Sequence, residues 1–180
     1  ETQLQTNIAN AKDTSTTLAQ RIEDKKATIE SFKQRLSTME SQVEFSKTKL
    51  KEVGIAADQP LETIRQAVAK FDDQISSLKG EQEAASRGVR DDQKRLVSLS
   101  AESRCPLCLQ PLSENYKGDL VQRIQVENNE RQKTMGQLQR EIEEIQRLKS
   151  TASVAFANLQ TLLPKMEDTR TRVDEESQEL

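Results

Sequence analysis

Two cysteines are the residues of this chain whose type and spacing could do chemistry. Cys105 and Cys108 lie two residues apart with Pro106 between them. Two thiolates at this spacing can bind one zinc ion, at about 2.3 Å, on a tight turn. Structural zinc takes four ligands, and the chain has no His and no other Cys. One chain therefore supplies half of a zinc site.

A second copy of the same motif is the simplest way to complete the site. Two C-x-x-C turns that meet tip to tip give four thiolates around one zinc ion shared between two chains. Each bound thiol must lose its proton, so we expect acid to weaken the link. Arg104 is placed to offset part of the negative charge of such a centre. Apolar contacts around the ion are expected from Leu107, Leu109, Leu112 and Tyr116.

Other interpretations of the two cysteines stay open. Carboxylates of Glu102 or Glu114 could join the ligands, although a mixed site would be unusual beside paired thiolates. A thioredoxin-like redox pair also has this spacing, but it needs a βαβ context that the sequence lacks. Two further alternatives are a disulfide between two tips and a pair of incidental thiols on a turn.

The composition indicates how such a motif is carried. The 180 residues are 33% hydrophobic and 32% charged with only 3% aromatics, which argues against one compact core. The formal net charge of −3 gives no sign of a phosphate-binding surface. We find no apolar run long enough for a membrane span, and no signal peptide. The start at Glu1 suggests an excised fragment, and the C-x-x-C pair fits a reducing, intracellular compartment.

Apolar residues recur in alternating steps of four and three, which is the heptad repeat of a coiled coil. The first series runs from Leu4 to Val53 and predicts an N-terminal arm over residues 1–53. A break follows at 54–60, where Gly54 can end a helix, Asp58 can cap the next one and Pro60 suits its first turn.

Two further segments continue the repeat on either side of the cysteines. They predict a hook-proximal arm over 61–102, the cysteine turn over 103–112 and a C-terminal arm over 113–180. Ser113 can cap the last helix, and Glu114 suits its N-terminal dipole. Pro164 is expected to kink or break this arm near 164.

These elements predict an all-α fold: a long antiparallel coiled-coil hairpin with the C-x-x-C at its apex, dimerising through the apex. Folding about the cysteines places Gly54 opposite Leu162 and Pro164, so Gly54, Pro60 and Pro164 form a predicted joint. The same register leaves about the first 35 residues without a partner in the chain. Polar seam positions are expected to set register and orientation. They are Lys25, Asp92, Asn128, Arg131 and Lys149.

With Cys105, Pro106 and Cys108 at the apex of two heptad arms, the chain resembles the zinc hook of the Rad-fifty/SbcC-type, SMC-like ATPases of DNA double-strand-break repair. Leu109 departs from the Gly that many C-P-x-C knuckles have at this position. The resemblance implies a homodimer through a shared zinc, and a full-length ATPase that works with a Mre-eleven/SbcD-type nuclease and DNA. Such a module tethers DNA ends or sister chromatids and is chromosome-associated, in the nucleus of a eukaryote or the cytoplasm of a prokaryote.

The chain itself is not expected to be an enzyme. It has no phosphate-binding G-x-x-x-x-G-K-[ST] loop and no His, and nothing in it predicts a pocket-forming core. The alternative function is a coiled-coil scaffold or adaptor whose apical C-x-x-C is a redox or partner-binding site.

Overall fold

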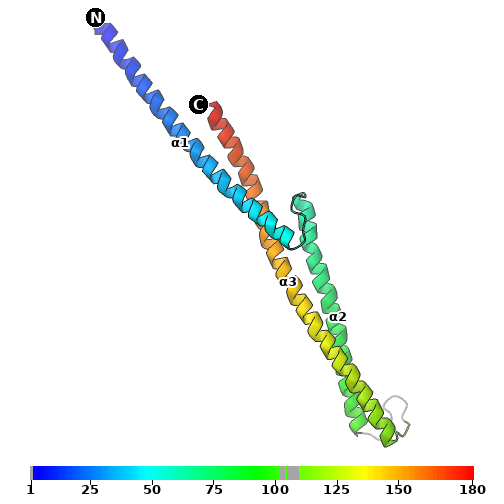
Figure 1. Cartoon of the computed structure of the whole chain (residues 1–180). Coiled ribbons are helices and arrows are strands. Elements are labelled where there is room, and N and C mark those ends of the chain that lie inside the picture. The colour runs from blue at the N-terminus through cyan, green and yellow to red at the C-terminus, as the bar shows by residue number, and fades with distance from the viewer. Residues whose placement is uncertain (1, 102–103, 105–109) are drawn as a thin grey trace. The chain divides into compact units, whose positions relative to one another are not determined.

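The chain is built from three long α-helices in the computed structural model. Helix α1 spans Thr2–Glu52, α2 spans Leu61–Ala101 and α3 spans Glu114–Gln178 (Figure 1). The all-α class expected from the heptad repeat is confirmed.

The structure describes residues 2–101, 104 and 110–180. Contacts divide the chain into two compact units. The terminal unit comprises residues 1–64 and 152–180, and the cysteine unit comprises residues 65–151. Helix α3 is continuous and contributes to both units.

In the terminal unit, α1 packs antiparallel to the C-terminal half of α3. Lys25 pairs with Glu176 across the two helices at 3.1 Å, and Arg170 pairs with Glu40 at 3.0 Å. Their seam is apolar and contains small residues, which lets the helices approach closely. The buried apolar residues of this unit are Ile29, Val43, Leu50, Ile55, Ala57, Ile64, Ala152, Ala155, Leu159 and Met166.

The end of α1 is closed by backbone hydrogen bonds of a Schellman motif. The Gly54 N–H donates to the Lys51 carbonyl at 3.0 Å, and the Ile55 N–H donates to the Leu50 carbonyl at 2.9 Å. Gly54 has φ of 79°, the left-handed conformation that glycine adopts without steric cost. Leu50 and Ile55 are both buried, as the apolar contact of this motif requires.

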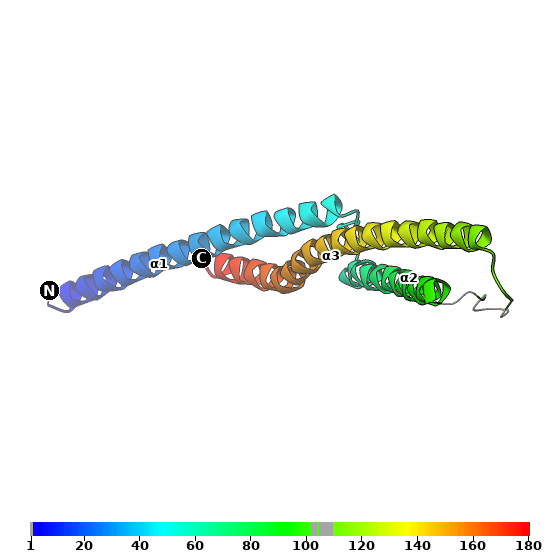
Figure 2. The ribbon, with the colours of Figure 1, turned by 90° about the horizontal axis from the view of Figure 1, so that it is seen from below.

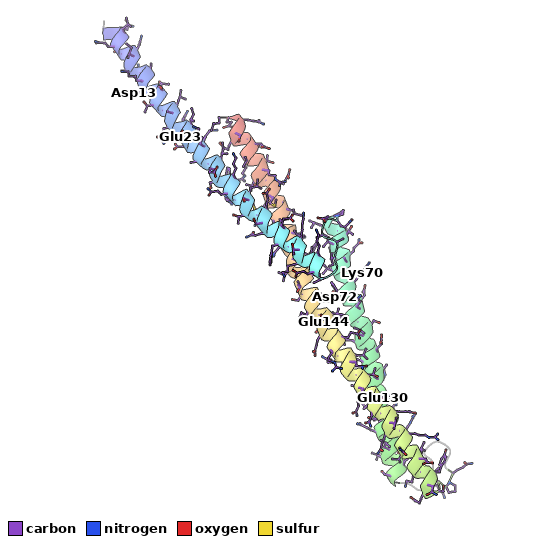
Figure 3. All side chains as sticks on the ribbon, in the orientation of Figure 1. Asp13, Glu23, Lys70, Asp72, Glu130 and Glu144 are labelled. Atoms are coloured by element: carbon purple, nitrogen blue, oxygen red, sulfur yellow. The ribbon has the colours of Figure 1, made fainter. Side chains whose placement is uncertain are left out.

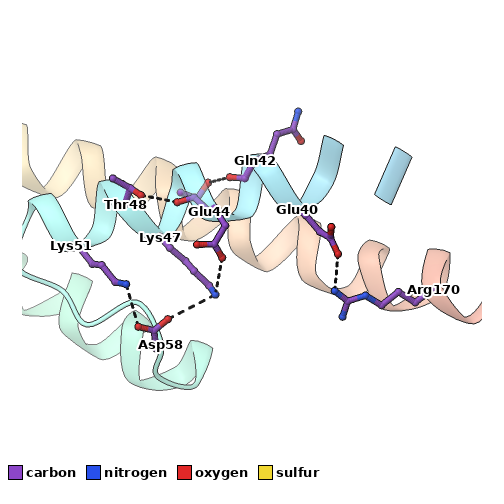
Figure 4. Close-up of polar contacts among 9 residues, drawn as sticks. Glu40, Gln42, Glu44, Lys47, Thr48, Lys51, Asp58 and Arg170 are labelled. Atoms are coloured by element: carbon purple, nitrogen blue, oxygen red, sulfur yellow. Dashed lines mark hydrogen bonds and ion pairs between the residues drawn. The ribbon is translucent and has the colours of Figure 1, made fainter. Parts of the chain in front are cut away.

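The start of α2 differs in detail from the sequence prediction. Its first turn hydrogen-bonds to Pro60, whose carbonyl accepts from the N–H groups of Thr63 and Ile64. Asp58, the predicted cap, lies two residues earlier. Its carboxylate instead pairs with Lys51 at 3.3 Å and Lys47 at 3.8 Å, which ties the turn to α1 (Figure 4).

In the cysteine unit, α2 and the N-terminal half of α3 lie side by side and antiparallel (Figures 1 and 2). Lys149 pairs with Asp72 at 2.5 Å, and Gln82 Nε2 donates to Gln139 Oε1 at 2.9 Å. The buried apolar residues are fewer than in the terminal unit. They are Ile75, Leu99, Ile124, Leu138 and Ile142.

The register of the terminal unit differs from the one extrapolated from the cysteines. Residues 25–35 do have a partner: Lys25 reaches Glu176, and Ile29 is buried. Leu162 shares a groove with Phe45, about two helical turns before Gly54. The turn between α1 and α2 does not lengthen the helix pair, so a register counted from the cysteines does not carry across it.

Helix α3 continues through Pro164, so the helix does not end there. Proline removes one N–H donor from the helical ladder, and the residues that follow remain helical up to Gln178. The proposed action of Gly54, Pro60 and Pro164 as a joint stays a prediction.

The outer faces of the helices are charged. Glu23, Lys70 and Glu130 are exposed on the packed helices, and Asp13 is exposed on the N-terminal part of α1 (Figure 3). Among the helices that the structure describes, none combines the length and apolar character that crossing a membrane requires.

Candidate metal centre

The cysteine segment connects α2 to α3. Cys105 and Cys108, with Pro106, Leu107 and Leu109, lie outside the described residues. The flanks of this segment are described, and they show how the chain enters and leaves it.

A β-bridge holds the two flanks together. Arg104 and Pro111 form an isolated antiparallel bridge. The chain positions immediately before Cys105 and shortly after Cys108 are therefore side by side. An antiparallel bridge places the facing backbones about 5 Å apart, so the segment between them is closed into a loop at its base. Closing a loop in this way removes chain entropy before any metal binds.

The exit flank is set by the cap of α3. The Ser113 Oγ accepts a hydrogen bond from the Tyr116 N–H at 3.4 Å, and the Ser113 carbonyl accepts from the Lys117 N–H at 2.9 Å. Ser113 is thus the N-cap, as its residue type predicts. Glu114 lies in the first turn, where the helix dipole favours a carboxylate.

Of the contact residues predicted around the metal, none of the three that the structure describes is fully buried within one chain. Leu112 is half-buried, whereas Arg104 is exposed and Tyr116 is 58% exposed. The flank of α2 is more firmly packed, because Leu99 is 1% exposed. The exposed ring of Tyr116 is therefore available for contact with another surface.

The described residues alone do not assemble a metal site. Among them, no group of three or more His, Cys, Asp or Glu side chains is close enough to hold an ion. Glu114, the one described carboxylate considered as a ligand, is exposed. The donors that the sequence offers for zinc are the two thiols, which are soft ligands suited to this metal.

Three of the predicted register positions lie close together in the cysteine unit. Asp92 pairs with Arg131, and Asn128 lies one turn away from Arg131 on α3. Lys25 and Lys149 pair separately with carboxylates on the facing helix. Sequence reasoning missed Gly88, which faces Arg131, and the bridge at Arg104. The sequence offered one signal for a special role of Gly88: glycine is a poor helix former, yet it stands in the middle of a long predicted helix.

Comparisons with known proteins do not assign the chain. No protein-family model matches it, and no significantly similar sequence or structure is found among the curated proteins or the solved structures.

Proposed function

We propose that this chain is a zinc-dependent homodimerisation module. Cys105 and Cys108 of two copies would bind one zinc ion at the apex of an antiparallel coiled-coil hairpin formed by α2 and α3. The single observation that best supports the proposal is the Arg104–Pro111 bridge. It closes the base of a segment whose only strong metal donors are two thiols at C-x-x-C spacing.

The donor set fits a shared zinc better than a site within one chain. Two thiolates leave two of the four tetrahedral positions unfilled, and a two-fold axis through the ion fills them with the same residues. When bound, zinc supplies four metal–sulfur bonds that join the two chains. Arg104 lies directly before Cys105 and would offset part of the charge of the four thiolates.

Exposed residues near the loop would be covered in such a dimer. Leu112 is half-buried and Tyr116 is largely exposed in one chain. Burying both against a second copy would add apolar contact to the metal–sulfur bonds. The total apolar area at one tip is small, so metal binding would dominate the association.

The resemblance to the zinc hook of Rad-fifty/SbcC-type ATPases extends this proposal to a biological role. The module would join two coiled coils of a DNA double-strand-break repair ATPase, and so tether DNA ends or sister chromatids. A Mre-eleven/SbcD-type nuclease and DNA would be partners of the full-length protein. These assignments follow from the C-P-x-C motif at the apex of two helical arms.

Zinc content and molecular mass, measured together on the same samples, test the proposal. We expect about one zinc per two chains, and a dimer that dissociates when a chelator removes the metal. Cys105→Ser with Cys108→Ser should remove both zinc and dimer while the helical circular dichroism stays nearly unchanged. The single variant Cys105→Ser leaves only two thiolates per pair of chains and should also be monomeric.

Two outcomes would contradict the proposal. One is a tightly bound zinc in a monomeric native chain, which would require ligands other than a second C-x-x-C. The other is freshly reduced protein that binds no zinc and whose assembly is insensitive to chelator. The second result would favour the scaffold or adaptor interpretation, with the thiols as a redox or partner-binding site.

A further inference from the structure

One stretch of the cysteine unit has half-buried apolar residues, such as Val89 and Met135, but no buried apolar residue among its described positions. On α2 the seam positions here include Gln82 and Ala85, and on α3 they include Asn128 and Arg131. The nearest buried apolar side chains among the described residues are Ile75 and Leu99 on α2 and Ile124 and Leu138 on α3. A seam of small and polar residues specifies register weakly by packing alone.

A buried carboxylate, paired with a partly exposed arginine, lies in this stretch. Asp92 is 1% exposed, and its carboxylate accepts a hydrogen bond from a guanidinium nitrogen of Arg131 on the facing helix. Its other oxygen lies 3.8 Å from the guanidinium of Arg95 on its own helix. A carboxylate this deeply buried is strongly destabilising if it loses its partner.

A second polar contact crosses the seam one turn away. Asn128 is 6% exposed, and its Nδ2 donates to the backbone carbonyl of Val89 on α2 at 3.4 Å. Its Oδ1 accepts from Nε2 of Gln132 at 2.7 Å. Both the nitrogen and the oxygen of the Asn128 amide therefore have a partner. One of the two partners is a backbone atom of α2, whose position along that helix is fixed.

Gly88 provides the space that Arg131 needs. A Cβ at Gly88 would lie 2.9 Å from both Cδ and Nε of Arg131, which is too close for an unchanged side chain. Gly80 and Gly136 in the same unit have nothing within 4 Å of such a Cβ. Glycine weakens a helix interior, and only at Gly88 does the structure give it a steric purpose.

We propose that Gly88, Asp92, Asn128 and Arg131 act together as a register lock. They admit one axial alignment of α2 and α3 in a stretch where apolar packing admits several. A slip by one heptad would move the helices about 10 Å along each other. Asp92 would then lose Arg131 and keep only Arg95 of its own helix, and Asn128 would lose the Val89 carbonyl and keep only Gln132. Slipped alignments therefore leave these buried polar groups with fewer partners.

The consequence of the lock lies at the cysteine segment. Arg104 and Pro111 can pair only if α2 and α3 end at matching heights. The register lock lies a few helical turns from these two residues. It would keep the two flanks of the cysteine segment in the alignment that forms the bridge. This inference concerns the helix pair and does not depend on zinc.

The two glycines give a matched test of the role of Gly88. Gly80→Ala should raise the melting temperature by about 2–4 °C, because alanine favours the helix and the added methyl meets nothing. Gly88→Ala should lose this gain or lower the melting temperature, because it displaces Arg131 from Asp92. In an Arg131→Ala background the Gly88→Ala gain should return. An equal gain from both single substitutions in the native background would overturn the assignment of Gly88.

The alignment itself can be measured by distances between two spin labels. The labels are carried on an unnatural amino acid at exposed positions Ser77 and Glu144, so that Cys105 and Cys108 remain in place. The native chain should give one narrow distance within the cysteine unit. The triple variant Asp92→Leu, Asn128→Leu, Arg131→Leu should remain helical but add distances that differ from the native one, as slipped alignments become populated.

The control replaces another ion pair between the same helices. Asp72→Leu with Lys149→Leu removes a partly exposed pair. Although Lys149 is one of the predicted register positions, its loss leaves no buried charge, so this variant should retain the single native distance. One unchanged narrow distance in the triple variant would overturn the register lock. Zinc content, measured in the same samples and again after chelation, keeps this result separate from the proposed dimerisation: either can fail while the other holds.

Discussion

Two segments connect the helices of this chain, and the described residues at each of them differ in how they are held. The turn between α1 and α2 is packed by its own residues, with Ile55 and Ala57 only 6% and 4% exposed. Gly54 closes the helix end, and Asp58 ties the turn to two lysines of α1. The flanks of the cysteine segment have one backbone bridge and mostly exposed side chains.

The difference lies in how much each connection buries within one chain. The turn between α1 and α2 buries apolar surface and makes backbone hydrogen bonds within the terminal unit. The cysteine segment has a closed base and two thiols, while its described flanks bury little. Under the proposed function, a metal and a second copy would supply the contacts that these flanks lack.

The largest expected effect comes from removing the apolar anchor of the first turn. Leu50 is 0% exposed, and its carbonyl receives the Ile55 N–H. We expect Leu50→Ala to lower the free energy of unfolding by about 2–5 kcal/mol, because it removes buried methyl groups and leaves a cavity. Denaturant titration followed by circular dichroism measures the change.

An exposed aliphatic residue is the control for this substitution. Val97 is 67% exposed, and Val97→Ala should change the free energy of unfolding by no more than about 0.5 kcal/mol. If Leu50→Ala were equally mild, the first turn would not be held by its own core. The zinc content should be unchanged in both variants, since neither residue lies at the thiols.

A smaller effect is expected from the backbone of the same turn. Gly54 has φ of 79° and open space around the position of a Cβ, so Gly54→Ala meets no neighbour but must adopt a left-handed conformation. We expect a loss of about 1–2 kcal/mol in the free energy of unfolding. Gly136→Ala, inside α3 with the same open space, should instead stabilise by up to about 1 kcal/mol. A stabilising Gly54→Ala would contradict the Schellman closure.

The heptad repeat predicted the helices well because each break carries its own signal. Gly54 marked the end of α1, and Ser113 marked the start of α3, since a left-handed glycine and a capping hydroxyl act locally. The partners across the helices could not be read in this way. Residues in a turn advance the sequence without lengthening the helix pair, so Lys25 meets Glu176 although a register counted from the cysteines leaves it unpaired.

The candidate site divides along the same line. The spacing of Cys105 and Cys108 is visible in the sequence because metal ligands are a matter of residue type. The Arg104–Pro111 bridge and the contact of Gly88 with Arg131 were not visible. Both arise from segments brought together by the antiparallel helix pair. No local sequence pattern shows which residues, far apart in the chain, will face each other across the helix pair.

The smallest expected effect comes from an exposed ion pair that clamps α3 to α1. Lys25 donates hydrogen bonds to Glu179 and to Glu176, and these raise the pKa of Lys25 above its ordinary value of 10.5. The hydrogen bond from Lys25 lowers the pKa of Glu179 below its ordinary value of 4.5. The stabilisation is therefore complete between pH 4.5 and pH 10.5. It is lost as the pH falls through the lowered pKa of Glu179, or rises through the raised pKa of Lys25.

We expect Lys25→Met to loosen the last turns of α3 slightly near neutral pH and to leave the rest of the chain unchanged. Heteronuclear NOE values of the backbone amides of residues 174–178 measure this loosening. The difference from the native chain should vanish at a pH below the lowered pKa of Glu179, where this carboxylate takes up a proton, and shrink in about 1 M salt, where screening is strong. Lys26→Met is the control, because Lys26 pairs only within α1, with Glu23, among the contacts described for it.

Equal loosening by both variants would mean that helix propensity near the end of the pair, rather than the ion pair between α1 and α3, decides how firmly α3 is held. An effect of Lys25→Met as large as that of Leu50→Ala would be more serious, because it would assign to exposed charge the stability that we attribute to the buried turn.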